Sequence, residues 1–308
     1  MEMRRLGSHG PEISVVGFGA WEAGGEYWGP NESDEAVIRA IHAGLDAGMN
    51  WIDTAEIYGG GRSEKLVGRA AAGRRDGVLI FTKVAPDDEG SGIRQDEIRG
   101  AIRGSLRRLG VDHVDLYQIH WPDDRIPIEE SWGAMCELQD QGLARDIGVS
   151  NVDRELVERC LAIRVPASVQ NLCSLVSPQD RGELIPWLAE RGIAYLAYSP
   201  LGKGLLTGAI TRDTILADGR SGSFGAQPRQ FTPGELERNL ERVERLRAVT
   251  DRIGETMATL ALRWVLELSP TTVVIAGSRN AGHTRDNAVA GSFTLDAATL
   301  AEIDAIFA

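Results

Sequence analysis

The 308-residue sequence predicts an α/β protein whose fold is a (β/α)8 TIM barrel, and two observations indicate this class. Short apolar, β-branched runs recur as candidate strands, and most alternate with segments that have helical periodicity and helix-ending signals. Strand and helix alternating eight times is the pattern of a parallel barrel. The eight candidate strands span residues 14–18, 50–53, 78–83, 114–120, 144–150, 167–171, 193–199 and 271–276.

The segments between these strands predict the rest of the barrel. Helices are expected over residues 34–47, 95–109, 128–141 and 153–163, with Gly48 and Gly110 placed to end the first two. A hairpin is expected over residues 3–13, before the first barrel strand. We therefore expect one domain that covers residues 1–308.

The interval between the seventh and eighth strands is much longer than the others. Residues 212–234 are rich in Gly, Ser, Arg and Pro and predict a long loop of the kind that serves as a lid. Charged helices are expected to follow over residues 235–253 and 255–268. A second domain is the alternative, but the interval is too short to form a core of its own.

Composition and charge exclude several classes of protein. The net charge of −12 argues against a nucleic-acid partner and against a basic, membrane-binding surface. The chain shows no secretory signal and no apolar run of membrane-spanning length, so we expect a cytoplasmic location. The three cysteines form no C-x-x-C pair and His113 and His120 have no further ligand cluster, so no metal site is expected. The oligomeric state is not indicated by the sequence.

Lysine is scarce in this chain. Of 33 basic residues, only Lys65, Lys83 and Lys203 are lysines, and the others are arginines. A lysine retained against this bias marks a place where the planar guanidinium of arginine does not serve.

Polar side chains stand at the carboxyl end of almost every candidate strand. In a parallel barrel these ends face one mouth, where active sites are built. The residues at these positions are Asp53, Lys83, His120, Ser150, Asn151, Gln170, Asn171, Tyr198, Ser199, Gly277, Ser278 and Arg279.

Four of the residues near this mouth have the chemistry that carbonyl reduction needs. A phenol such as Tyr58 is a weak acid unless a neighbouring cation stabilises its anion, and Lys83 supplies a cation. Asp53 would keep the buried ammonium charged, and His120 would donate a hydrogen bond to the substrate oxygen. We therefore expect Tyr58 to protonate the developing alkoxide.

These residues belong to longer stretches that resemble the aldo-keto reductase family over essentially the whole chain. The matching stretches are Gly17-Phe-Gly-Ala-Trp21, residues 50–59 (NWIDTAEIYG), Ser63-Glu64, Lys83, Gln118-Ile-His-Trp-Pro122, Gly148-Val-Ser-Asn151, Gln170-Asn171, Tyr198-Ser-Pro-Leu-Gly202 and residues 277–287. The resemblance implies a barrel that binds NADPH in extended form and transfers hydride to an aldehyde or ketone, with Asp53, Tyr58, Lys83 and His120 as the catalytic tetrad.

The resemblance also implies a set of cofactor-binding residues. Ser150, Asn151 and Gln170 would hold the nicotinamide carboxamide, and Tyr198 would stack on the ring. Ser199, Leu201, Gly202 and Lys203 would lie along the pyrophosphate. The adenosine end would be surrounded by Gly277, Ser278, Arg279, His283, Asp286 and Asn287, with Arg279 as a fork for the 2′-phosphate. Gly19, Ala20, Trp21 and Asp53 complete the set.

Two departures from the family pattern bear on the choice of cofactor. His283 stands where the family usually has Gln or Arg, and Ala276 replaces a frequent proline. The resemblance still implies NADPH, but these two departures weaken the preference for NADPH over NADH, and NADH remains possible.

Two other functions are compatible with a lysine-bearing barrel of this kind. A cofactor-sensing regulatory subunit with little turnover is one alternative, and a barrel isomerase or aldolase that uses Lys83 as a Schiff-base amine is another. A Rossmann dehydrogenase is disfavoured because no glycine-rich stretch completes G-x-G-x-x-G.

The substrate is expected to be a small molecule with a carbonyl group and an apolar or aromatic portion. Trp21, Trp28 and Trp121 are expected to line its pocket together with Tyr58 and His120.

Overall fold

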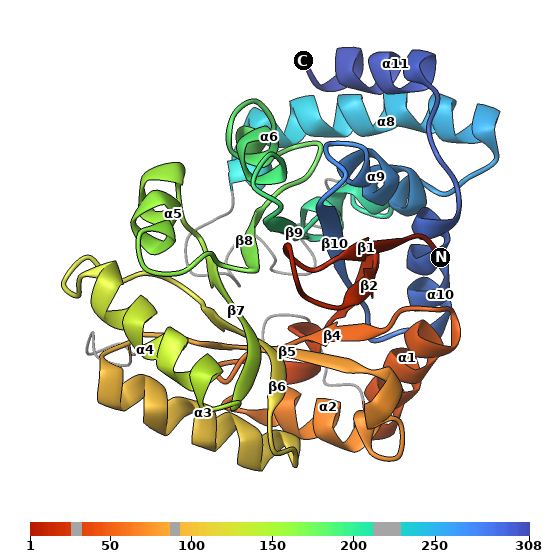
Figure 1. Ribbon diagram of the computed structural model, residues 1–308. Helices are drawn as coiled ribbons and strands as arrows, with labels where there is room; N and C mark the ends of the chain where they lie inside the picture. The colour runs from red at the N-terminus through yellow and green to blue at the C-terminus, as the bar shows by residue number, and fades with distance from the viewer. Residues whose placement is uncertain (26–32, 87–92, 212–228) are drawn as a thin grey trace.

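Eight parallel strands close into a barrel in the computed structural model, which describes residues 1–25, 33–86, 93–211 and 229–308 (Figure 1). Around the barrel the strand order is β10-β3-β4-β5-β6-β7-β8-β9. The strands are β3 (Val16–Gly19), β4 (Trp51–Asp53), β5 (Leu79–Val84), β6 (Val114–Ile119), β7 (Ala144–Ser150), β8 (Ser168–Leu172), β9 (Ala194–Tyr198) and β10 (Thr272–Gly277). The predicted fold class is confirmed, and each candidate strand agrees with an observed one to within two residues at either end.

The register of the strands brings their carboxyl ends to one level. Gly277 pairs with Gly19, and Gly19 pairs in turn with Asp53. On the other side of the barrel, Ser150 pairs with Gln170. Because all eight neighbouring pairs are parallel, the polar residues that end the strands meet at one mouth.

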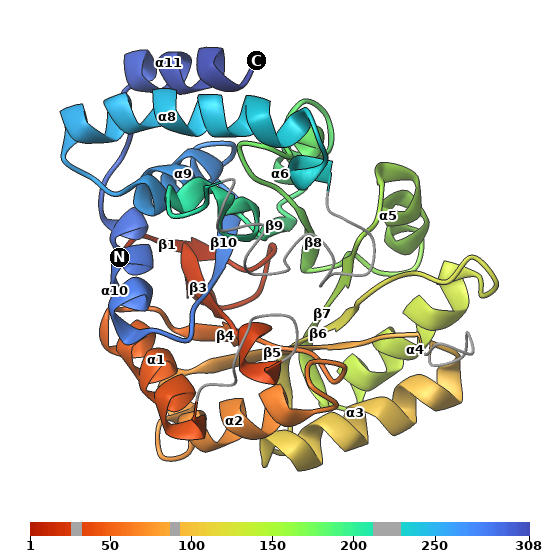
Figure 2. The ribbon, with the colours of Figure 1, turned by 180° about the vertical axis from the view of Figure 1, so that it is seen from behind.

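Helices surround the barrel (Figures 1 and 2). Their bounds are α1 (Asp34–Asp46), α2 (Arg62–Ala71), α3 (Gln95–Leu109), α4 (Ile128–Asp140), α5 (Arg154–Leu161), α6 (Leu184–Ala189), α8 (Glu235–Ile253), α9 (Met257–Leu266), α10 (Ala281–Val289) and α11 (Ala297–Phe307). The six helices expected from the sequence are present. The sequence did not single out α2, α6, α10 and α11, of which α6 is short and contains Pro186, whereas α10 carries Gly282 and has little amphipathic character.

The predicted N-terminal hairpin is present and covers the amino-terminal end of the barrel. Strands β1 (Met3–Arg5) and β2 (Glu12–Ser14) pair antiparallel. Their Leu6 and Ile13 pack into a cluster with barrel residues that include Trp51, Phe81 and Leu116. Trp51 also donates a hydrogen bond from Nε1 to the Ser14 carbonyl at 2.8 Å. A β-carbon on Gly17 would lie 2.2 Å from the Trp51 ring, so that position requires glycine.

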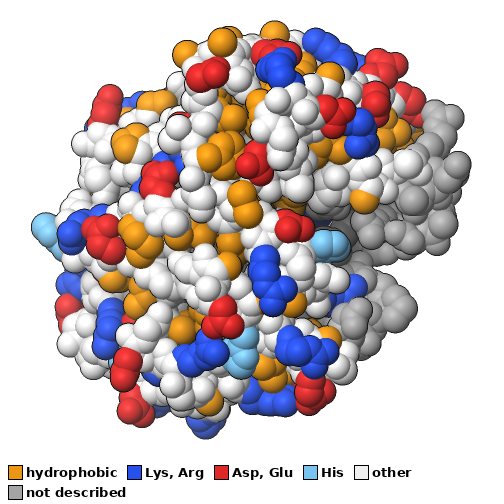
Figure 3. Space-filling view, turned by 90° about the vertical axis from the view of Figure 1, so that its right-hand side faces the viewer, with side chains coloured by type: hydrophobic (Ala, Val, Ile, Leu, Met, Phe, Trp, Pro, Cys, Tyr) orange, Lys and Arg blue, Asp and Glu red, His pale blue; other side chains and the backbone are white. Residues whose placement is uncertain are grey.

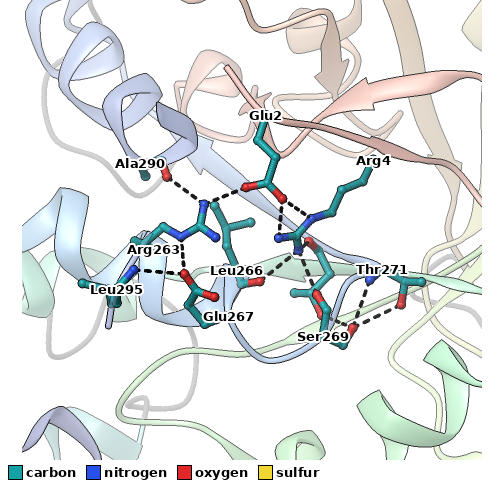
Figure 4. Close-up of polar contacts among 10 residues, drawn as sticks. Glu2, Arg4, Arg263, Leu266, Glu267, Ser269, Thr271, Ala290 and Leu295 are labelled. Atoms are coloured by element: carbon teal, nitrogen blue, oxygen red, sulfur yellow. Dashed lines mark hydrogen bonds and ion pairs between the residues drawn. The ribbon is translucent and has the colours of Figure 1, made fainter. Parts of the chain in front are cut away.

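A network of ion pairs and hydrogen bonds ties this hairpin to α9, the helix before β10 (Figure 4). Arg263 of α9, only 2% exposed, donates to Glu2 and Glu267 at 2.8 Å each. Glu2 also pairs with Arg4, whose guanidinium donates to the backbone carbonyls of Leu266 and Ser269. The network therefore fixes the hairpin against α9 and the turn that leads from α9 to β10.

The long interval between β9 and β10 adds helices to the outer layer. α8 packs on α9 and α11, and α9 packs on β10 (Figure 1). Most of the loop predicted at 212–234, residues 212–228, lies outside the described residues, and its interpretation as a lid stays a prediction. Among the described residues, no helix combines the length and apolar character needed to cross a membrane.

Asp146 of β7 lies beneath the hairpin and makes stability depend on pH. Its Oδ2 would lie 3.1 Å from a β-carbon on Gly10. Burial, and next the charge of Asp115, raise the pKa of Asp146 to about 6, against the opposing effects of Arg145 and His9. Because the folded pKa exceeds the ordinary value near 3.9, the ionised carboxylate destabilises the fold above about pH 6, and this cost disappears as the pH falls toward 4.

We therefore expect Asp146→Asn to raise the melting temperature at pH 7.5 and to raise it much less at pH 4, near the ordinary carboxyl pKa. Thermal unfolding at the two pH values measures the difference. Asp251→Asn, at an exposed position on α8, is the control and is expected to change the melting temperature little at either pH. An equal effect of Asp146→Asn at both pH values would show that ionisation of Asp146 is not the cause.

Candidate active site

A cavity of about 420 Å³ opens at the carboxyl end of the barrel. This end of the barrel lies opposite the hairpin and faces the viewer in Figure 2. Most of the cavity walls are strand-end residues. The lining side chains and glycines are Gly19, Trp21, Glu22, Asp53, Ile57, Tyr58, His120, Trp121, Ser150, Asn151, Gln170, Tyr198, Ser199, Lys203, Ile275 and Gly277.

Lys83 lies at the base of this site and does not line the cavity. Its side chain is fully buried, and its Nζ donates to Asp53 Oδ1 at 2.5 Å and to the Thr54 carbonyl at 2.9 Å. Burial lowers the pKa of Lys83, and the adjacent Asp53 carboxylate opposes that shift. The ion pair is therefore what favours a charged ammonium at this buried position.

Gln170 completes the environment of Asp53 from across the barrel. Its Nε2 donates to Asp53 Oδ2 at 3.0 Å, so both carboxylate oxygens accept hydrogen bonds. This contact links β8 to the pair formed by β4 and β5.

Tyr58 lies above the ammonium, in the turn after β4. The Lys83 Nζ is 5.3 Å from the centre of the Tyr58 ring. Burial of the phenol, and next the negative charge of Asp53, raise the pKa of Tyr58 well above its ordinary value near 10. Tyr58 therefore keeps its proton throughout the physiological pH range.

His120 follows β6 and contacts Tyr58. The two ring centres are 5.6 Å apart and the rings meet edge to face, while Trp121 stacks on the other side of His120 at 3.8 Å. Burial, and next the positive charge of Lys83, hold the pKa of His120 well below its usual value. The imidazole is therefore neutral at pH 7 and donates or accepts hydrogen bonds without carrying charge.

The polar wall opposite Tyr58 is held by hydrogen bonds among its own residues. Ser150 Oγ donates to the Gln170 carbonyl at 2.6 Å. Asn151 Nδ2 donates to the His120 carbonyl at 2.8 Å, and its Oδ1 accepts from the Tyr198 hydroxyl at 2.7 Å. Asn151 holds this position with φ of +57°, a conformation in which Asn is tolerated better than most residues.

A second, larger cavity of about 880 Å³ adjoins the first. Its lining residues are Glu22, Ala36, Arg39, Pro200, Leu201, Lys203, Gly204, Thr207, Ala209, Ile210, Thr256, Ala258, Ile275, Ala276, Gly277, Ser278, Arg279, Asn280, Ala281, His283, Asp286 and Asn287. Glu22, Lys203, Ile275 and Gly277 line both cavities, so the two spaces meet there. We call the larger space the outer groove.

The two joined cavities suit an extended dinucleotide. The inner one offers amide groups and the Tyr198 ring for a planar nicotinamide. The outer groove offers the cations Lys203 and Arg279 for phosphates. A β-carbon on Gly277 would lie 2.9 Å from the Gly19 carbonyl, so backbone forms the wall where the spaces meet.

The structure brings together most of the site predicted from the sequence. Of the predicted residues, Lys83, Asn171, Ala20 and Gly202 are buried and line neither cavity. Asn171 instead donates to the Val152 carbonyl and to Asp180, and Ala20 donates its backbone N–H to the Asp53 carbonyl. Trp28 lies outside the described residues. The outer groove contains Leu201, Ser278, Arg279, His283, Asp286 and Asn287 as expected.

Several lining residues were not predicted. Glu22, Ile57 and Ile275 line the inner cavity, and Arg39 reaches the outer groove from α1. Glu22 directly follows the matched stretch that ends at Trp21, and Ile57 lies within the matched stretch 50–59, so both could have been found from the motifs. Arg39 lies inside an amphipathic helix, where a charged residue is expected to face solvent.

A barrel with a buried lysine and aspartate beneath a tyrosine and a histidine defines a class of oxidoreductase, and comparisons identify the family. The model of the Aldo/keto reductase family matches residues 15–308. Aldo-keto reductase YhdN of Bacillus subtilis is 33% identical, over 99% of this chain and 93% of that protein. The NADH-specific methylglyoxal reductase of Escherichia coli is 31% identical, over 94% of this chain and 93% of that protein.

Solved structures agree with this. A glycerol dehydrogenase of Gluconobacter oxydans superposes with a TM-score of 0.86 and 32% identity, over 99% of this chain and 94% of that one. An aldo-keto reductase of Klebsiella pneumoniae in complex with NADPH has a TM-score of 0.78 and 28% identity, over 100% of this chain and 95% of that one. The chain belongs to the aldo/keto reductase family and is an NAD(P)H-dependent oxidoreductase that acts on small-molecule carbonyl compounds.

The buried ion pair makes a prediction about stability. Asp53→Asn leaves Lys83 buried without its counter-charge, so that folding requires the ammonium to lose its proton, and we expect the free energy of unfolding to fall by roughly 3–5 kcal/mol. Urea denaturation measures this. Asp34→Asn removes a carboxylate from exposed pairs with Arg62 and Arg69 and is expected to change stability by no more than about 1 kcal/mol. Equal losses in the two variants would contradict the importance of burial.

Proposed function

We propose that this enzyme reduces an aldehyde or ketone to an alcohol with NADPH, and that Tyr58 is the general acid. The observation that carries the proposal is the placement of Tyr58 and His120 in the lining of one cavity, which adjoins the outer groove, with the Lys83–Asp53 ion pair at its base. A bound NADPH supplies the hydride. The residues of the chain orient the substrate carbonyl and donate the proton.

In the proposed mechanism, the substrate carbonyl lies against Tyr58 and the neutral His120. His120 orients the oxygen by a hydrogen bond, and the phenol donates its proton as negative charge develops there. An alkoxide is more basic than a phenolate, so this transfer is favourable although the pKa of Tyr58 is raised. Lys83 then stabilises the tyrosinate that results.

The cofactor is proposed to extend across both cavities. Ser150, Asn151 and Gln170 would hold the carboxamide, and Tyr198 would flank the nicotinamide ring. Lys203 and Arg279 would bind phosphate groups in the outer groove, in line with the Klebsiella relative that holds NADPH. NADH remains possible because the E. coli relative is NADH-specific.

The rim of the inner cavity suits a substrate with an apolar portion. Trp121 and Ile57 are 40% and 42% exposed. The ring centre of Trp21 lies 6.3 Å from the ring centre of Tyr58. These side chains offer apolar surface beside the reacting groups. A role for Trp28 stays a prediction.

The position of Lys83 disfavours the Schiff-base alternative. Its side chain has no exposed surface and its Nζ already bonds Asp53 and Thr54, so a substrate carbonyl has no path to it. No feature of the described residues favours the regulatory alternative. We further propose that residues 1–308 act as one domain and that the enzyme works in the cytoplasm.

Tyr58→Phe is expected to lower kcat by about 10²- to 10⁴-fold, because it removes the proton donor and leaves the ring in place. Oxidation of NADPH over a panel of aldehydes measures turnover, and fluorescence titration measures NADPH affinity, which is expected to stay the same. A Tyr58→Phe enzyme with unchanged kcat would refute the assignment of Tyr58.

The pH dependence of reduction follows from the two shifted groups. His120 stays neutral because its pKa lies well below the usual value, and Tyr58 stays protonated because its pKa is raised. We therefore expect kcat/KM to be level between about pH 6 and 8, with no inflection near the ordinary histidine pKa of about 6.5. An inflection there that disappears in His120→Gln would contradict the neutral imidazole.

A further inference from the structure

The outer groove contains a cation that the cofactor motifs do not account for. Arg39 belongs to α1, which packs on α10, and both Arg39 and Ala36 one turn before it line the groove. Figure 3 shows the face over α1 and α10, where a hollow has a histidine and Lys or Arg side chains at its edge. The groove residues on the α10 side are Ala281, His283, Asp286 and Asn287.

Arg39 makes no ion pair or hydrogen bond with the described part of the chain, although acids are close in sequence. Glu35 stands one helical turn before it, where an i,i+4 pair would form. Instead, Arg69 of α2 pairs with both Glu35 and Asp34, and Arg62 also pairs with Asp34. The guanidinium of Arg39 is therefore left for another partner.

Two backbone N–H groups at the start of α10 are already engaged by a side chain. Asn280 Oδ1 accepts hydrogen bonds from the N–H groups of Gly282 at 2.7 Å and His283 at 3.2 Å. Ser278 Oγ donates to the Asn280 carbonyl at 3.2 Å. Because these donors are already used, charged side chains are the stronger candidates to bind a phosphate at this end of the groove.

We infer that Arg39 is a specificity-determining residue that binds the 2′-phosphate of NADPH together with Arg279. The inference rests on the proposed function, in which the adenosine end of NADPH occupies the outer groove. Two guanidinium groups that line this groove, one on α1 and one after β10, would hold a doubly charged phosphate that NADH lacks. Asp286 is the acidic groove residue of α10, and the ribose hydroxyls are the groups that its carboxylate would accept from.

The test compares nucleotide affinities of wild type, Arg39→Ala, Arg39→Lys and a control, Arg103→Ala. Arg103 is an exposed arginine on α3, a helix that contributes no residue to the groove. Titration of tryptophan fluorescence measures Kd for NADPH and NADH. Adenosine 2′,5′-bisphosphate and 5′-AMP serve as probes that differ by the 2′-phosphate.

We expect Arg39→Ala to raise Kd for NADPH and for the bisphosphate about tenfold, and Arg39→Lys to raise it less. Kd for NADH and 5′-AMP is expected to stay within about twofold in every variant, and Arg103→Ala to bind all four like wild type. Unchanged NADPH affinity in Arg39→Ala would overturn the inference. Equal losses for NADPH and NADH would overturn it too, since the residue would then act on the shared part of the cofactor or on folding, which the melting temperature distinguishes.

This outcome is separable from the proposed function. Nucleotide binding requires no turnover, so an inactive protein that selectively loses NADPH affinity in Arg39→Ala would uphold the inference and refute carbonyl reduction. An active reductase whose Arg39→Ala variant keeps its NADPH affinity would do the reverse.

Discussion

The ion pair between Lys83 and Asp53 is the interaction on which the catalytic end of the barrel depends. An ammonium with no exposed surface is stable only beside a counter-charge, and Asp53 lies 2.5 Å away on the neighbouring strand. Gln170 bonds the same carboxylate from β8. The pair therefore ties three strands together and places positive charge beneath the ring of Tyr58, where a proton has to be released.

Charge is distributed unevenly over this acidic protein. A net charge of −12 does not favour a polyanionic cofactor, but Arg39, Lys203 and Arg279 all line one groove. Many acidic residues are engaged elsewhere, as Asp34 is with two arginines of α2. Local arrangement of cations thus outweighs the net charge where phosphate has to bind.

The sequence predicts the barrel and the tetrad because both follow from local pattern. Strand ends carry polar residues, and parallel strands bring those ends together. The bond from Gln170 to Asp53 joins residues far apart in the sequence, and no local pattern indicates it. Arg39 was not predicted for a related reason. Among the described residues it lacks an acidic partner because arginines of α2 pair with Asp34 and Glu35 of α1, and the sequence does not indicate these pairs. The sequence also does not predict that Lys83 lies below the cavity and not in its wall, because strand periodicity does not indicate how deeply a side chain is buried.

The scarcity of lysine makes the central claim directly measurable. With Lys65, Lys83 and Lys203 as the only lysines, a sample labelled with ¹³C at lysine Cε gives three assignable signals by NMR. Titration should show the Lys83 signal in its charged position at pH 7 in wild type, and shifted to the neutral position in Asp53→Asn at the same pH. A Lys83 that is neutral at pH 7 in wild type would contradict the account, because no cation would then stand beneath Tyr58.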